Sequence, residues 1–158
     1  MQLTFGRSIT PIISLDIAIT RMAVTSEKEA EAQAGDNRTM GRKSILPYGL
    51  YLAKGFFSPA FAHQTGVTER DLKLFWTALI NMWDLDRSAS RGMMACRGLY
   101  VFTHDNPLGN APAHILFNRF EARLREGSDT PRRFEDYVVY LNDRDMPEGV
   151  TLTKLVEG

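Results

Sequence analysis

The side chains best placed for chemistry in this sequence are cations that have no carboxylate near them in the chain. Residues 37–68 hold Arg38, Arg42, Lys43 and Lys54 but no aspartate or glutamate. Arginine offers a planar fork of N–H donors and lysine a mobile point charge, and both bind phosphate oxygens. Because the whole chain carries 19 basic and 19 acidic residues, this segment predicts a local anion-binding surface. A solvated face is the alternative.

Aromatic side chains interleave with these cations at Tyr48, Tyr51 and Phe56. Single-stranded RNA is bound by this combination, because bases stack on aromatic rings while cations hold the backbone. The alternative is that the tyrosines belong to the core. A second segment without acids, residues 87–104, carries three further arginines.

The sequence offers little for catalysis or metal binding. The histidines His63, His104 and His114 lack a partner at helical spacing, and zinc needs about four ligands. Cys96 is the only cysteine, and no orienting acid accompanies it. We therefore expect no catalytic residue, no metal and no cofactor. An RNA endonuclease with His104 or His114 as general base is the enzymatic alternative.

The composition is that of a soluble globular protein, with 44% hydrophobic and 24% charged residues. A length of 158 residues fits a single domain over residues 1–158. We expect a mobile loop at about residues 25–43, where the chain is polar and contains glycine. A single cysteine, no signal peptide and no long apolar run predict a cytoplasmic protein without a membrane partner.

The periodicity predicts two helices. Residues 68–87 place large apolar side chains on one stripe, with Thr68 as N-cap. Residues 112–125 form the second predicted helix, and residues 26–38 allow at most a short one. Alternation predicts strands in the first 24 residues and at residues 44–57, 97–104, 134–141 and 149–156. Together these elements predict an α+β domain with a mostly antiparallel sheet.

Six sequence blocks occur together in the order of a known family. They are ITRMAVT (19–25), DNRTMGRK (36–43), PYGLY (47–51), RGLYVF (97–102), LGNAPAH (108–114) and PEGVTL (147–152). On these blocks the chain resembles the CRISPR-associated backbone subunit of the type I-C Cascade, which coats the guide RNA. The similarity runs over essentially the whole chain.

The resemblance implies a ferredoxin-like, RRM-related antiparallel sheet with inserted loops. It also implies an RNA-binding scaffold and not an enzyme, in the cytoplasm of a prokaryote. Copies would stack along the crRNA and contact the target DNA strand and other type I-C Cascade subunits. The RNA-binding residues implied by matching positions are Arg21, Asn37, Arg38, Arg42 and Lys43, with Arg91 and Arg97 as further candidates.

The resemblance also suggests that the chain corresponds to the C-terminal half of the family fold. We therefore expect an incomplete sheet, because the N-terminal half would supply a closing strand. An unpaired edge favours pairing with another chain. The alternative function is accordingly a protein–protein module that self-associates or docks on other Cascade subunits with little RNA affinity.

Overall fold

The computed structural model describes residues 1–21, 26–32, 39–87 and 92–158. Strands and helices are mixed, and all strand pairs among these residues are antiparallel. The predicted α+β class is therefore confirmed. Strands pair as separate two-stranded ladders across the described part of the chain, and the ferredoxin-like arrangement stays a prediction.

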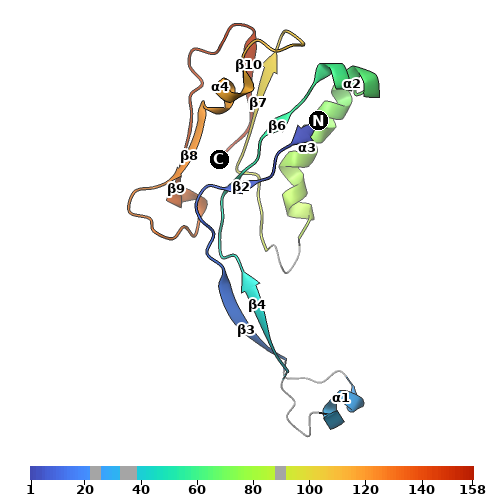
Figure 1. Ribbon diagram of the computed structural model, residues 1–158, viewed down its shortest axis with the longest axis vertical. Coiled ribbons are helices and arrows are strands. Elements are labelled where there is room, and N and C mark those ends of the chain that lie inside the picture. Colours follow the sequence, from blue (N-terminus) through green and yellow to red (C-terminus); the bar gives the residue numbers. More distant parts are fainter. Residues whose placement is uncertain (22–25, 33–38, 88–91) are drawn as a thin grey trace.

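Residues 2–21 and 39–56 form one long antiparallel ribbon that is interrupted twice. Three ladders make up this ribbon: β1 (Gln2–Leu3) with β6 (Gly55–Phe56), β2 (Arg7–Ser8) with β5 (Tyr51–Leu52), and β3 (Leu15–Arg21) with β4 (Thr39–Ile45). Figure 1 shows the β3–β4 end extending away from the rest of the molecule. We call these two strands the β3–β4 hairpin.

Each interruption of the ribbon shifts the register by one residue. Residues 4–6 lie opposite residues 53–54, and residues 9–14 lie opposite residues 46–50. The first strand thus holds one extra residue at each break, which is a β-bulge at the first break. A bulge increases the local twist and re-aims the neighbouring side chains.

The continuous strand predicted for residues 44–57 is wrong. The chain pairs from Thr39 to Ile45 in β4, so residues 39–43 of the expected loop belong to a strand. Pro47 then lacks the N–H that a ladder needs. A Cβ at Gly49 would lie 2.9 Å from the Tyr51 ring, so a larger residue fits there only if the ring moves.

The described part of the first 87 residues contains three helices. Helix α1 (Glu27–Ala32) lies between β3 and β4 in the chain, and α2 (Pro59–Thr65) and α3 (Glu69–Leu85) follow β6. The predicted N-cap of α3 is confirmed. Asp71 N donates to Thr68 Oγ1 at 3.3 Å, and Thr68 N donates to Asp71 Oδ2 at 2.8 Å. This capping box satisfies two N–H groups at the start of the helix.

The apolar stripe of α3 is only half-buried. None of its side chains is fully buried, although Phe75 and Trp76 meet edge to face at 5.3 Å. Trp83 Nε1 donates to the Leu79 carbonyl within the same helix at 2.7 Å. The apolar stripe therefore packs against the rest of the molecule only in part.

The C-terminal region contains a second strand system. Its elements are β7 (Gly98–His104), α4 (Ala113–Phe117), β8 (Phe120–Leu124), the 3-10 turn Phe134–Asp136, β9 (Tyr137–Leu141) and β10 (Val150–Glu157). The β8–β9 pair is nested between β7 and β10, which pair with each other. The strands predicted over residues 97–104, 134–141 and 149–156 are confirmed within a few residues.

The helix predicted for residues 112–125 ends at Phe117. Residues 120–124 instead form a ladder with β9. Phe120, Ala122 and Leu124 are half-buried while the residues between them are exposed, which is the period of a strand. Long-range pairing therefore overrides the helical pattern seen in the sequence.

The molecule exposes far more surface than a typical monomer of its size. Its accessible surface is 12260 Å², whereas the usual scaling gives about 8,000 Å² for 17.9 kDa. Among the described residues the buried hydrophobic side chains are Leu116, Tyr137 and Val150. In the described ranges, no helix is both long and apolar enough to cross a membrane.

Candidate nucleic-acid interface

Arg42 and Lys43 of the β3–β4 hairpin lie on opposite faces of the hairpin. Arg42 pairs with Ala18 and Lys43 pairs with Ile17. Residues opposite each other in a ladder share a face, and consecutive residues alternate between faces. The two cations that the sequence placed together therefore present their charge in opposite directions.

The face of Arg42 also carries Asp16, which pairs with Ser44 and accepts a hydrogen bond from its hydroxyl. Arg42 and Asp16 line a shallow cavity of about 330 Å³. A carboxylate on this face opposes the attraction of an anion by Arg42.

The face of Lys43 is apolar at Leu15, Ile17 and Ile19, whose exposed fractions lie between 41% and 48%. Lys43 itself is half-buried. A Cβ added at Gly41, on the same face, would meet nothing within 4 Å. The surface next to Lys43 is therefore open to solvent at this glycine.

The other predicted RNA contacts are placed only in part. Arg21 is the last residue of β3, and its backbone pairs with Thr39 at the far end of the hairpin. Asn37, Arg38 and Arg91 lie outside the described residues.

Arg97 precedes β7 and contacts the 3-10 turn. Its guanidinium lies 4.1 Å from the centroid of the Phe134 ring and 4.0 Å from Glu135 Oε1. Burial raises the pKa of Tyr48, and the charge of Arg97 acts against that increase. Arg97 is thus engaged by the 3-10 turn, and its charge also acts on Tyr48.

The two tyrosines of the basic segment have different surroundings. The rings of Tyr48 and Tyr137 are 6.2 Å apart, and Tyr137 is one of the buried residues. Tyr51 is 51% exposed. Tyr48 therefore contributes to packing, and Tyr51 is free to meet a ligand.

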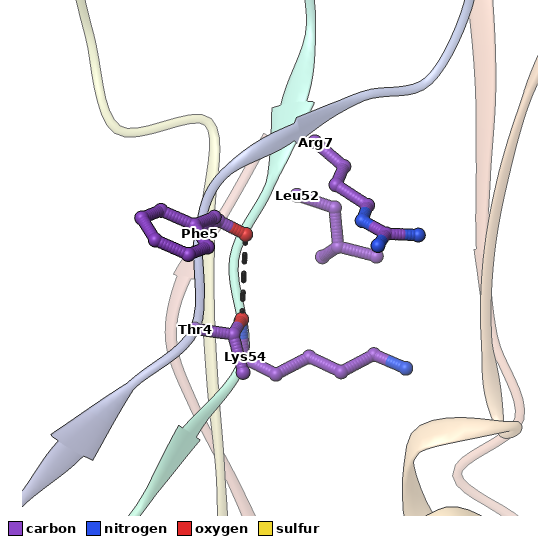
Figure 2. Close-up of a pocket in the computed structure, with 5 residues that line it drawn as sticks. All are labelled: Thr4, Phe5, Arg7, Leu52 and Lys54. Carbon is purple, nitrogen blue, oxygen red and sulfur yellow. Dashed lines mark hydrogen bonds between the residues drawn. The ribbon is translucent and has the colours of Figure 1, made fainter.

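Sequence reasoning missed a pair of cations that the first bulge brings together. Figure 2 shows Arg7 and Lys54 extending to the same side of the ribbon, with Leu52 between them. These residues line a cavity of about 290 Å³ together with Thr4 and Phe5. Lys54 was among the cations counted in the sequence, but Arg7 is 47 positions away and only the strand register joins the two. We call this cavity the bulge cleft.

The histidines considered for catalysis have ordinary surroundings. His104 Nδ1 accepts a hydrogen bond from Asn110 N at 2.9 Å, which orders the turn after β7. His114 is exposed in α4. Over the ranges that the structure describes, no group of three or more His, Cys, Asp or Glu side chains could hold a metal ion.

Comparison with known proteins places the chain in a family. The model of the family described as CRISPR-associated protein Cas7 matches residues 1–142. The chain therefore belongs to the CRISPR-associated protein Cas7 family, whose members are backbone subunits of Cascade-type complexes. Members of this family bind crRNA and other Cascade subunits. No curated protein matches the chain.

Proposed function

We propose that this chain is a crRNA-binding backbone component of a type I-C CRISPR surveillance complex, and a binding protein with no catalytic role. Membership of the Cas7 family supports this function. The observation that carries it is the β3–β4 hairpin, which projects from the molecule and carries Arg21, Arg42 and Lys43 (Figure 1). Its one carboxylate among the described residues is Asp16.

The proposed contacts are to phosphate and not to bases. Arginine and lysine on an exposed ribbon bind the backbone, and such contacts carry no sequence information. A guide-binding subunit has to accept any spacer sequence. The exposed ring of Tyr51 could also stack on a base, and such stacking does not depend on which base it is. Within the complex, the same scaffold would lie next to the target DNA strand and to further copies of itself.

The function is tested by measuring the affinity of the full chain for two unrelated single-stranded RNAs by fluorescence anisotropy between 50 and 500 mM NaCl. Equal affinities and a steep salt dependence are expected. The double variant Arg42→Ala/Lys43→Ala should reduce the slope of log K against log[salt] by up to about 1.4, since each phosphate contact on a single strand contributes about 0.7.

The matched control is Lys73→Ala/Arg87→Ala, which removes two exposed cations from the end regions of α3. These cations already pair with Glu69 and Asp84 at 3.0 Å. The control should bind RNA as the wild type does. A strong preference for one RNA, or equal losses in both double variants, would contradict the proposal.

The subtype is tested separately by co-expression. Tagged chain should assemble with the other subunits of a type I-C complex and fail to assemble with those of another type I subtype. Assembly with both sets would leave the Cas7 role intact and remove the type I-C assignment.

A second candidate function is a protein–protein module with little RNA affinity. It is favoured by the accessible surface, which exceeds the expected value by roughly half. Light scattering on nuclease-treated protein would then show an oligomer that grows with concentration. A nucleic acid that co-purifies and whose removal changes the size would count against it.

A further inference from the structure

The first bulge of the ribbon has a defined residue count. In the register on either side, Thr4 lies opposite Lys54 and Arg7 pairs with Leu52, so Phe5 and Gly6 together face Ala53. Thr4 N donates to the Lys54 carbonyl at 2.8 Å, while Lys54 N donates to Thr4 Oγ1 at 2.9 Å. The threonine hydroxyl thus takes the place of a main-chain acceptor and fixes the bulge.

The bulge determines which side chains share a face. Without the extra residue, Arg7 would have the opposite orientation relative to Lys54, because a shift of one residue turns a strand over. With the extra residue, Arg7, Leu52 and Lys54 face one side, and the ring of Phe5 points to the other (Figure 2). The cations of the bulge cleft therefore come from two strands and flank an apolar side chain.

Both cations of the bulge cleft are available for an anion. Arg7 and Lys54 are exposed, and within the described residues neither takes part in a salt bridge. Lys54 Nζ lies 5.0 Å from the centroid of the Phe117 ring, and Phe117 is itself held edge to face by Phe56 at 5.4 Å. A cation–π contact of this kind restrains the ammonium group without neutralising it.

We propose that the bulge cleft is a second binding site for the phosphodiester backbone of single-stranded RNA, with Arg7 and Lys54 as the phosphate-binding residues. The inference rests on the proposed function and adds a site to it. Arginine supplies a planar fork and lysine a point charge, and the side chain of Leu52 offers an apolar surface for the sugar. The strands that carry the cleft residues continue into the β3–β4 hairpin (Figure 1), so one RNA strand running along the ribbon could contact both sites.

The test measures RNA affinity and its salt dependence for the full-length variant Arg7→Ala/Lys54→Ala. This variant should bind RNA more weakly than the wild type, and the loss should be about 25-fold larger at 0.1 M salt than at 1 M. Since two phosphate contacts are lost, the slope of log K against log[salt] should fall by about 1.4. The variant Arg7→Lys/Lys54→Arg keeps both charges and should retain most of the affinity. Arg132→Ala, which removes an exposed cation outside the ribbon, should change the affinity little.

The outcomes separate this inference from the proposed function. If the wild type binds RNA and Arg42→Ala/Lys43→Ala weakens it, but the cleft variant binds as tightly as the wild type, the cleft inference alone is overturned. If the wild type does not bind RNA, both fail. A cleft variant that changes the oligomeric state in light scattering but leaves RNA affinity unchanged would identify a protein contact and overturn the inference. Circular dichroism checks that each variant is folded.

Discussion

Arg42 and Lys43 are adjacent in the sequence but lie on opposite faces of the β3–β4 hairpin, opposite Ala18 and Ile17 respectively. A nucleic acid strand that follows one face of the hairpin can therefore contact only one of the two side chains closely. The faces also differ in charge, because Asp16 shares the face of Arg42.

From this arrangement we expect Lys43→Ala to weaken RNA binding more than Arg42→Ala. Asp16 repels phosphate on the face of Arg42, whereas the face of Lys43 has no carboxylate among its described residues. Because Lys43→Ala removes one phosphate contact, its loss of affinity relative to the wild type should be about fivefold larger at 0.1 M salt than at 1 M. Anisotropy titrations of the two single variants provide the measurement.

The control for this comparison is Asp16→Asn, which removes the repulsion and should raise the RNA affinity slightly. Equal losses for both single variants, with no effect of Asp16→Asn, would mean that the two faces do not differ toward RNA.

Tyr137 connects the N-terminal ribbon to the second strand system. Its hydroxyl lies 2.8 Å from Thr10 Oγ1, and the residue is only 3% exposed. Tyr137→Phe should lower the free energy of unfolding by about 1 kcal/mol, because a partly buried hydroxyl loses its partner. Urea denaturation measures the change. Tyr140→Phe, at a position 58% exposed, is the control and should unfold as the wild type does.

Alanine substitutions at Gly149 and Gly127 would separate the cost of a steric collision from the cost of a left-handed backbone conformation. Both have a positive φ, at 73° and 83°. A Cβ at Gly149 would collide with the side chains of Asn110 and Asp105, whereas at Gly127 it would meet nothing within 4 Å. Gly127→Ala should therefore cost about 1 kcal/mol. Gly149→Ala should cost more, because the hydrogen-bonded side chains of Asn110 and Asp105 must also move. Similar melting temperatures for the two variants would show that the turn around Gly149 can move aside.

The capping box of α3 makes this helix sensitive to acid. The pKa of Asp71 is lowered from 3.8, first by the hydrogen bond from the Thr68 hydroxyl and then by that from the Thr68 backbone. A carboxylate with a lowered pKa stabilises the folded state at neutral pH, and this contribution is lost as the pH falls below 3.8 and through the folded-state pKa. Thermal melts at pH 7 and pH 3 should therefore show a smaller difference between wild type and Thr68→Ala at the lower pH. A difference that did not change with pH would contradict this account.

Local signals in the sequence predicted α3 well and α4 poorly. The N-cap, the acidic first turn and the apolar stripe of α3 all depend on residues within one or two helical turns of each other. The residues of β8 have an acceptable helical pattern, but their hydrogen bonds go to β9, which is separated from them by residues 125–136. No local pattern reports such a partner, so the predicted helix continued too far.

The same limit applies to the candidate interface. The sequence indicated the basic segment from the absence of acids, but it could not assign faces to Arg42 and Lys43 because the register with β3 was unknown. It missed that Arg7 and Lys54 lie on the same face, because a one-residue bulge decides whether they do. Both features depend on register, which a single strand does not encode by itself.

The nesting of the strand pairs has a consequence for the order of folding. The β8–β9 ladder closes residues 125–136, and the enclosing β7–β10 ladder closes residues 105–149. Closure of a long flexible loop costs conformational entropy that grows with the logarithm of its length. Once the inner ladder has formed, the outer one joins ends that are already close, and the ribbon has the same nesting around residues 22–38. In each half of the chain, pairing can therefore proceed from the innermost ladder outward. The bulge cleft and the outer ends of β7 and β10 are then completed last.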